Sequence, residues 1–370
     1  MEGEERRWIH RIALAMLKGI GPVNARNLVA YCGGVDALFT DPKVGKALAK
    51  VPGIGPKLLS EITGKSTLLR AERELDWVRK QGLRMLFYQD AGYPRRLKHA
   101  VDAPVLLYVK GNADLDPERS VAIVGTRRPT EHGRHLCEAL VEGLASAGVT
   151  IVSGLAYGID ITAHRKCLAL DIPTVGVLGH GLRRIYPAQH QAVARAMAQS
   201  GGLLSEYPSY TMPDREHFPM RNRIIAGLCD ALIVVETRKK GGSMISAHMA
   251  NDYNKDVFAV PGRIKDSCSE GCNHLIKCHK AALIEQAADI AYVMRWDEPQ
   301  AQKAIQKQLF VELTESEKIV VDLLSQYEAV GIDQLTGTLQ VANSQMAGLL
   351  LELEFKGVIR ALPGKRYVLV

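Results

Sequence analysis

The sequence predicts an α/β protein with a parallel-sheet core, a helical module before it and a winged helix after it. Two observations predict the sheet: short apolar runs end at glycines or charged residues, and helical stretches separate them. The runs are continuous rather than alternating, as in strands buried on both faces. Helices between such strands indicate crossover connections. The six runs are 121–125, 151–154, 175–179, 203–206, 231–236 and 257–262.

Composition limits the class of protein. The 370 residues carry a formal net charge of +7, which permits an anionic partner without proving one. No apolar run approaches the length of a bilayer span, and the charged, acidic-rich start lacks the order of a signal peptide. We therefore expect a cytoplasmic protein without a membrane partner. The seven scattered cysteines do not predict a disulfide framework.

Residues 8–70 are predicted to be helical, and two similar turns occur there, at 17–23 and 51–57. Each has the order apolar-G-I-G-P, in which glycines allow a tight turn and proline opens the next helix. Free amides at such a helix start can bind phosphate, as in helix–hairpin–helix modules. An ordinary turn between packed helices is the alternative. Two copies favour the helix–hairpin–helix interpretation, and DNA binding by this module stays open.

The remaining boundaries follow from changes in pattern. Strand-like stretches at 83–88 and 105–109 surround a turn-rich segment, and 297–312 is polar and glutamine-rich, as in a linker. The predicted division is a helical module at 1–70, a connecting segment at 71–112, the sheet domain at 113–296, a linker at 297–312 and a winged helix at 313–370.

Three helices followed by two strands predict the winged helix. Thr314 and Glu317 fit a capping box that opens the first helix, and Pro363–Gly364 fits the turn between the strands. A DNA-reading third helix should expose Arg, Lys, Asn or Gln. This helix has no base-reading arginine, so a protein contact is favoured over DNA. Its exposed side chains are predicted to be Asn343, Ser344, Gln345, Glu352 and Glu354.

The loop after the first core strand predicts phosphate binding. Gly125 lets a backbone approach, Thr126 supplies a hydroxyl, and Arg127 supplies a planar fork of donors. The dinucleotide fingerprint G-x-G-x-x-G is absent, and the next strand ends in Ser153–Gly154 rather than in an acid. An NAD site is therefore disfavoured.

The loop after the second core strand combines small residues with a helix start. Ser153 and Gly154 leave room for a ligand, and the following helix points its amino end at the same crevice. Asp160 and His164 lie one helical turn apart. They can form an acid–base pair or serve as a cap and a packing histidine, and the second interpretation is favoured.

Two further segments place cations at predicted helix starts. Arg221, Asn222 and Arg223 open an apolar helix, where positive side chains oppose the macrodipole. Anion binding explains that choice, and a surface salt bridge is the alternative. After the next strand come cations, then glycines, then a hydroxyl. The predicted site residues in this second segment are Lys240, Gly242 and Ser243.

Segments 124–127, 153–160, 218–227, 257–262 and 269–276 closely resemble the bacterial DNA-processing protein A family, DprA or Smf. The resemblance implies an extended Rossmann domain, a sterile-alpha-motif-like front end and a winged-helix tail. It implies a homodimeric single-stranded DNA-binding protein of natural transformation, which protects incoming DNA and loads RecA recombinase. Arg127 corresponds to the family's pocket arginine, and Arg221–Asn222–Arg223 to its Arg-Asn-Arg motif. The small pocket-loop positions correspond to Gly125, Ser153, Gly154 and Ser243. His180 departs from the family, where many relatives carry cysteine.

Other chemistries find less support. The spacing of Cys268, Cys272 and Cys278 is not that of structural zinc sites, and no P-loop or serine nucleophile elbow occurs. We predict no catalytic residue, cofactor or metal. The alternative is a nucleoside-monophosphate hydrolase-like enzyme that uses the same crevice, with Glu206 or Glu236 activating water. Anchoring of the arginines by these two carboxylates is the favoured interpretation.

Overall fold

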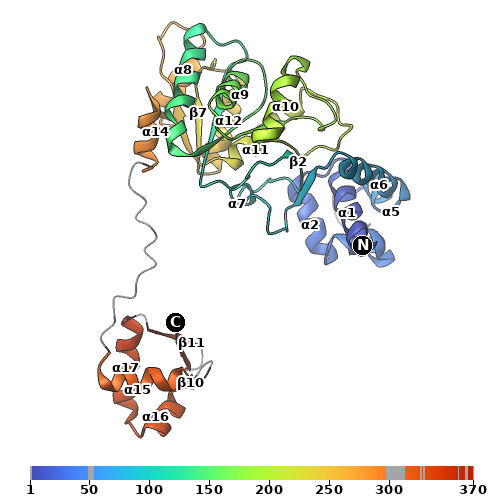
Figure 1. The fold of residues 1–370 in the computed structure, drawn as a ribbon. Helices are drawn as coiled ribbons and strands as arrows, with labels where there is room; N and C mark the ends of the chain where they lie inside the picture. The colour runs from blue at the N-terminus through green and yellow to red at the C-terminus, as the bar shows by residue number, and fades with distance from the viewer. Residues whose placement is uncertain are drawn as a thin grey trace. The chain divides into compact units, whose positions relative to one another are not determined.

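The computed structural model describes residues 2–48, 54–296 and 313–369, except 326, 328, 329, 357 and 363–365. The chain forms two compact units, Met1–Asp297 and Glu298–Val370 (Figure 1). Within the described ranges, every helix is too short or too polar to cross a bilayer.

The described residues of the first unit form a nine-stranded sheet in the order β1-β2-β6-β5-β4-β3-β7-β8-β9. The strands from β6 to β9 pair in parallel, and β1 and β2 extend the sheet in antiparallel pairing. The six predicted strands all form, so the predicted α/β fold is confirmed. The bounds are β1 (Arg84–Phe87), β2 (Leu106–Gly111), β3 (Arg119–Val124), β4 (Val149–Ser153), β5 (Thr174–Leu178), β6 (Gly202–Ser205), β7 (Ala231–Val234), β8 (Asp256–Ala259) and β9 (Ala282–Leu283).

The strand order reverses beside β3. The chain runs from β3 outward through β4, β5 and β6, and then returns to β7 on the other side of β3. Val124 and Val234, the last residues of β3 and β7, lie opposite each other in the register. The carboxyl ends of two strands at such a reversal are the usual ligand-binding place in a parallel sheet.

Helices cover both faces of the parallel strands (Figure 1). Because successive strand residues point to opposite faces, Ile123 packs with one helix layer and Val124 with the other. The first layer contains α8 (Glu131–Gly143), α9 (Ile159–Ala169) and α14 (Ala287–Val293). The second contains α11 (His217–Leu228), α12 (Gly242–Asp252) and α13 (Glu270–Lys277). Helix α10 (Gln191–Ser200) packs in a further cluster with β2 and the N-terminal helices.

The N-terminal residues are helical as predicted. The helices are α1 (Glu2–Ala15), α2 (Pro22–Cys32), α3 (Val35–Thr40), α4 (Pro42–Leu48), α5 (Pro56–Thr63) and α6 (Lys65–Lys80). Pro22 and Pro56 each open a helix after an extended glycine, as the two turns predict, although residues 51–53 of the second turn lie outside the described residues. The predicted boundary at residue 70 falls inside α6, and β1 and β2 both come from segment 71–112. The division of the first unit into domains stays a proposal.

A buried carboxylate joins α6 to the loop after β6. Glu74 is 1% exposed and accepts hydrogen bonds from the Ser209 amide at 2.7 Å and the Ser209 hydroxyl at 2.6 Å. Burial raises the pKa of Glu74, and the two hydrogen bonds oppose that rise. Because both carboxylate oxygens have donors, the loop is held against the helical module.

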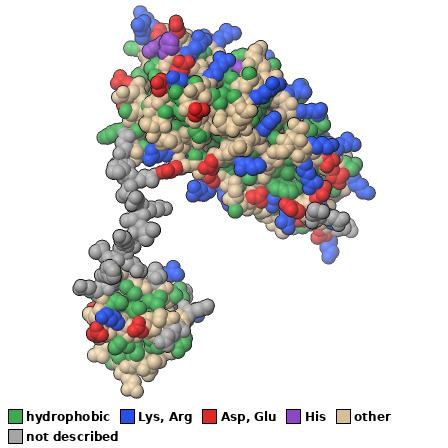
Figure 2. All heavy atoms as spheres, viewed as in Figure 1, with side chains coloured by type: hydrophobic (Ala, Val, Ile, Leu, Met, Phe, Trp, Pro, Cys, Tyr) green, Lys and Arg blue, Asp and Glu red, His purple; other side chains and the backbone are tan. Residues whose placement is uncertain are grey.

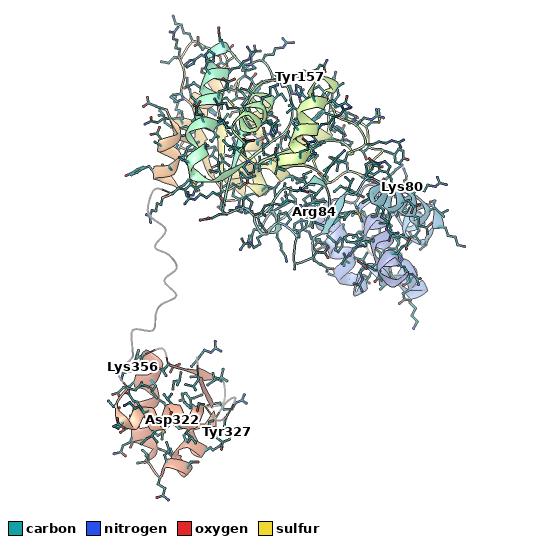
Figure 3. The ribbon with its side chains drawn as sticks, viewed as in Figure 1. Lys80, Arg84, Tyr157, Asp322, Tyr327 and Lys356 are labelled. Carbon is teal, nitrogen blue, oxygen red and sulfur yellow. The ribbon has the colours of Figure 1, made fainter. Side chains whose placement is uncertain are left out.

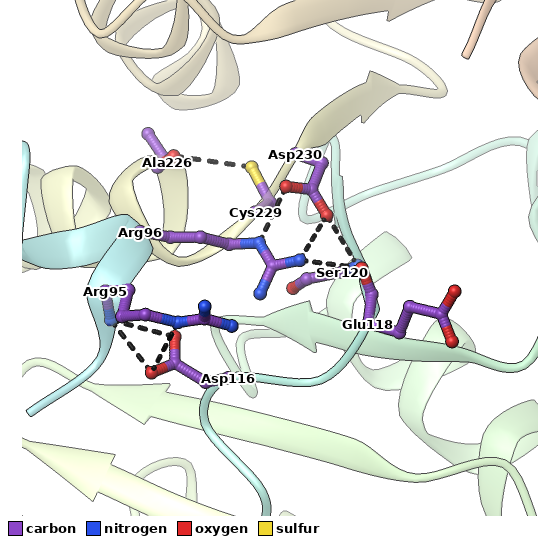
Figure 4. Close-up of polar contacts among 8 residues, drawn as sticks. All are labelled: Arg95, Arg96, Asp116, Glu118, Ser120, Ala226, Cys229 and Asp230. Carbon is purple, nitrogen blue, oxygen red and sulfur yellow. Dashed lines mark hydrogen bonds and ion pairs between the residues drawn. The ribbon is translucent and has the colours of Figure 1, made fainter. Parts of the chain in front are cut away.

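An arginine fork fastens the short helix α7 (Arg95–Lys98) to the sheet (Figure 4). Arg96 Nε donates to Asp230 Oδ1 at 2.6 Å, and its Nη2 donates to Oδ2 at 2.8 Å. The same carboxylate accepts from the Ser120 amide at 2.9 Å. This two-bond geometry fixes the turn-rich segment at the amino ends of β3 and β7.

The second unit is a winged helix, as predicted. Its elements are α15 (Glu315–Leu324), β10 (Val330–Gly331), α16 (Ile332–Leu339), α17 (Asn343–Phe355), β11 (Ile359–Leu362) and β12 (Arg366–Leu369). The strands pair in the order β10-β12-β11. The predicted capping box forms between Thr314 and Glu317, and the predicted Pro363–Gly364 turn lies outside the described residues.

Glu317 gives the winged helix a pH-dependent contact. Its side chain is fully buried, and both carboxylate oxygens accept from Lys356 Nζ, at 2.6 and 2.7 Å. The hydrogen bond from Lys356 lowers the pKa of Glu317. A carboxyl with a lowered folded-state pKa stabilises the fold above its unfolded pKa of about 4.3, and that contribution is lost as pH falls through the folded-state pKa.

We therefore expect Glu317→Gln to reduce amide protection factors in α15 at pH 7, with the difference from the wild type closing in acid. Hydrogen exchange followed by mass spectrometry measures these protection factors in the variant and in the wild type. Glu315→Gln is the control, because its pair with Lys318 is exposed. A difference between Glu317→Gln and the wild type that persists unchanged at low pH would contradict this role.

Candidate nucleic-acid interface

A cleft of about 890 Å³ opens where β3 and β7 end. We call it the switch-point cleft. The loops after β3 and β7 line it, together with residues at the start of α9 and α12 and the cleft-facing side of α11. It therefore lies at the reversal of strand order, where the fold predicts a ligand.

The cleft is strongly cationic. Among the described residues that line it, Asp160 is the one carboxylate. Such an imbalance in a concave surface concentrates anions. The lining cations are Arg127, Arg215, Arg221, Arg238 and Lys240.

Glycines allow the loops after β3 and β4 to touch. A Cβ on Gly125 would lie 2.5 Å from Ile159 Cγ1, at the first residue of α9. Gly158 has φ +82°, and a Cβ there would lie 2.2 Å from the Thr126 carbonyl oxygen. The Ile159 amide donates to that same oxygen at 3.2 Å. This contact sets the position of Arg127 relative to α9.

Arg221 forms the buried floor of the cleft. It is 4% exposed, and its Nη1 donates to the carbonyl oxygens of Gly154, at 2.7 Å, and Val177. Burial lowers the pKa of Arg221 to about 10, opposed by the charge of Asp160, so the guanidinium stays charged at neutral pH. Burial also raises the pKa of Asp160, opposed by Arg221 and by the amides of Ala156 and Gly154. The fixed positive charge of Arg221 is thus part of the cleft.

The start of α12 offers donors to the cleft. Its N-cap is Gly241, which supplies no side-chain cap, and Gly242 and Ser243 begin the helix. Unpaired amides at a helix start attract anions. The Ser243 hydroxyl is buried and has no hydrogen-bond partner among the described residues. It is therefore available to a ligand oxygen.

Two aromatic rings stand beside the cations. Arg127 Cζ lies 5.4 Å from the centroid of the Phe218 ring, and the Tyr186 ring lies 5.9 Å from Phe218. All three residues line the cleft, and Tyr186 is 49% exposed. Flat surfaces next to cations suit a ligand with both phosphates and bases.

The structure brings most of the predicted site residues together. Eight line the cleft: Gly125, Thr126, Arg127, Arg221, Asn222, Lys240, Gly242 and Ser243. Ser153 is buried outside the lining and donates to the Ile123 carbonyl oxygen at 2.6 Å. Gly154 also lies outside the lining, and a Cβ there would lie 2.4 Å from Arg221 Nη1. Its role is to leave space for that guanidinium.

Arg223 faces away from the cleft. It is 2% exposed, pairs with Glu206 and donates to the Asp102 carbonyl oxygen at 2.5 Å. The prediction that the Arg-Asn-Arg motif opens a helix is wrong, because α11 begins at His217 and the motif lies in its second turn. The macrodipole argument therefore does not apply there, and Arg221 is instead held by the carbonyl oxygens of Gly154 and Val177.

Sequence reasoning missed Arg215, Arg238 and Tyr186, which also line the cleft. Arg238 directly precedes Lys239–Lys240, so its basic neighbours were an available signal. Tyr186 follows Arg183 and Arg184, which were a similar signal, whereas Arg215 stands between Asp214 and Glu216 and has no basic neighbour. Tyr157, labelled in Figure 3, lies outside the lining, and its hydroxyl donates to Gln189 Oε1 at 2.8 Å.

The candidate acid–base residues all have hydrogen-bond or ion-pair partners within the protein. Asp160 accepts from the amides of Gly154 and Ala156, at 3.2 and 3.4 Å. His164 Nδ1 lies 2.7 Å from Thr174 Oγ1, and burial lowers the pKa of His164 to about 3, so it is a neutral packing residue. Glu206 anchors Arg223, in agreement with the favoured interpretation. Glu236 instead accepts from the amide and the hydroxyl of Thr130, at 2.9 and 2.5 Å.

The two units match two parts of one family of proteins. Residues 84–295 match DNA recombination-mediator protein A, and residues 306–365 match the DprA winged helix domain. The chain is also 32% identical over 396 residues to protein Smf of Synechocystis, covering 98% of each chain. The chain belongs to the DprA/Smf family. This confirms the family that the sequence motifs indicate.

Solved DprA structures agree with the fold. DNA processing protein A of Streptococcus pneumoniae superposes with a TM-score of 0.68 at 33% identity, over 77% of this chain and 97% of the pneumococcal chain. The Helicobacter pylori DprA structure, described for its single-stranded DNA binding mode, gives a TM-score of 0.53 at 34% identity, over 58% of this chain and 96% of the other. The fold of this DprA/Smf member is therefore shared with relatives of known structure.

Among the described residues, no three His, Cys, Asp or Glu side chains gather as a metal site.

Gly158→Ala is expected to lower the free energy of unfolding by about 1–3 kcal/mol, because alanine strains at this backbone conformation and meets the Thr126 carbonyl. Urea unfolding followed by tryptophan fluorescence measures the change. Gly242→Ala is the matched control, since a Cβ there meets nothing within 4 Å. Equal stability of the two variants would contradict the loop contact.

Arg223→Ala is expected to lower the free energy of unfolding by about 3–5 kcal/mol, because Glu206, which is only 15% exposed, is left without its partner. The double variant Glu206→Gln/Arg223→Met removes both charges and should regain much of the stability. Urea unfolding again gives the values. Unchanged stability together with weakened oligonucleotide binding would show instead that Arg223 contacts a ligand.

Proposed function

We propose that the switch-point cleft binds the sugar–phosphate chain of single-stranded DNA and breaks no bond in it. The observation that carries this proposal is the charge of the cleft, in which five cationic side chains stand against one carboxylate among the described lining residues. Phosphate contacts supply most of the affinity in binding that does not depend on base sequence. The free amides of α12 and the Ser243 hydroxyl add donors at the same place.

The aromatic pair favours a single strand over a duplex. Unpaired bases can stack on Phe218 and Tyr186, whereas the bases of a duplex are already stacked on one another. Few aromatic rings line the cleft, so sequence preference should be weak. The binding mode described for the H. pylori relative supports the same ligand.

Hydrolysis of nucleotides finds less support in the geometry. A hydrolase needs a carboxylate placed to activate water. Glu206 and Glu236 are engaged by Arg223 and Thr130 and do not line the cleft. Asp160 does line it, but its Oδ2 accepts from two backbone amides. These bonds favour a structural role for Asp160.

The wider role follows from the family. We propose that this protein receives and protects single strands during natural transformation, loads RecA recombinase on them and acts as a homodimer. The match to DNA recombination-mediator protein A supports a role in recombination. The winged helix exposes Leu351 and Phe355 on α17, at 54% and 84%, which favours a protein contact for that helix over DNA.

Arg127→Ala is expected to flatten the plot of log K against log salt by about 0.7, the share of one phosphate contact on a single strand. Fluorescence anisotropy of a labelled oligothymidine at several salt concentrations gives the slope. Arg128→Ala is the matched control, because Arg128 is the exposed neighbour and does not line the cleft.

Two results would count against the proposal. A slope unchanged by Arg127→Ala, or changed equally by Arg128→Ala, would remove Arg127 from the interface. Release of phosphate from nucleoside monophosphates by the wild-type protein would support the hydrolase instead.

A further inference from the structure

A second cationic hollow lies beside α10. It measures about 400 Å³ and is bounded by β2, the loop at 182–185 and α10. We call it the α10 groove. Among its described lining residues there is no Asp or Glu, and its cations are Lys110, Arg183, Arg184 and Arg195. All four are exposed, and Figure 2 shows Lys and Arg side chains over α10 and the loops beside it.

One loop belongs to both hollows. Tyr186 lines the switch-point cleft, whereas Arg183, Arg184 and Ile185, directly before it, line the α10 groove. The two hollows are therefore neighbours across a few residues of backbone. The groove cations Arg183 and Arg184 are therefore within three residues of Tyr186 in the cleft lining.

The loop is held in place at both ends. The Gly181 amide donates to the Thr211 carbonyl oxygen at 3.0 Å, and a Cβ on Gly181 would lie 2.2 Å from the Pro208 carbonyl oxygen. On the other side, His190 Nδ1 lies 2.8 Å from the Leu155 carbonyl oxygen. Such anchoring prepares the surface before a ligand arrives and reduces the entropy lost on binding.

The groove also has apolar surface, and an aromatic ring outside its lining stands beside one of its cations. Leu182, Ala194 and Leu203 form buried parts of its lining. Arg183 Cζ lies 4.4 Å from the ring centroid of Tyr210, which is 63% exposed. Cations over apolar surface, with a flat ring at the edge, suit a chain that alternates phosphates with sugars and bases.

We infer that the α10 groove is a second subsite for the phosphodiester chain, and that one strand runs from the switch-point cleft over Tyr186 into it. This inference rests on the proposed function of the cleft. Because adjacent residues of one loop line both hollows, the same strand is favoured over an acidic peptide as the occupant. A strand that reaches both hollows gains contacts that a shorter one lacks.

The test compares an oligothymidine of about 4 nucleotides with one of about 16, the range of site sizes of single-strand-binding OB folds. In the full-length protein, Arg183→Ala/Arg195→Ala should leave binding of the short strand unchanged. For the long strand it should weaken binding and flatten the salt plot by about 1.4, the share of two contacts. The control, Arg134→Ala/Arg295→Ala, removes the same charge from two exposed arginines that line neither hollow, and it should change neither length.

The outcomes separate the two claims. The second subsite is overturned if the double variant binds the long strand as tightly as the wild type does, or loses equal affinity for both strands. It is also overturned if an acidic peptide binds at the groove without displacing the long strand. If Arg127→Ala still weakens binding of both the short and the long strand, the proposed function of the cleft stands even when the second subsite is overturned. If Arg127→Ala changes binding of neither strand, the proposed function of the cleft fails and the inference fails with it.

Discussion

The contact between the loops after β3 and β4 is the constraint on which the cleft depends. Gly125 and Gly158 let the backbone after β3 meet the first residue of α9, and a Cβ at either position would collide with that contact. Arg127 is two residues after Gly125, so its place on the rim is set by backbone packing rather than by its own side chain. The strand reversal beside β3 then puts the loop after β7 opposite it.

The cations of the cleft stand at two depths. Arg221 is buried, and its Nη1 donates to the Gly154 and Val177 carbonyl oxygens, whereas Arg127 and Lys240 are exposed. Although burial lowers the pKa of Arg221 to about 10, the guanidinium stays charged at neutral pH, and Asp160 and backbone oxygens hold that charge in the floor. The exposed cations can move to meet phosphates at varying positions. A fixed floor and an adaptable rim together suit a polymer whose charge repeats but whose sequence varies.

Packing outside the sheet helps to shape this surface. Glu74 holds the loop after β6 through Ser209, and that loop contacts the Gly181 backbone. The helical module therefore supports the loop that borders both the switch-point cleft and the α10 groove. At the amino ends of β3 and β7, the pair of Arg96 and Asp230 likewise holds α7 against the sheet. The N-terminal helices thus influence the candidate interface without lining it.

The strands, the parallel sheet, the winged helix and the loops that carry glycines, hydroxyls and cations could be predicted from the sequence, because each depends on a local pattern. Which of those side chains share a surface depends on contacts between distant parts of the chain. Arg221 and Arg223 are two residues apart, which is about 200° around a helix, so one faces the cleft and the other faces Glu206. That choice needed the helix start at His217 and its orientation on the sheet. Arg215, Arg238 and Tyr186 joined the cleft because folding brought together loops that are far apart in the chain.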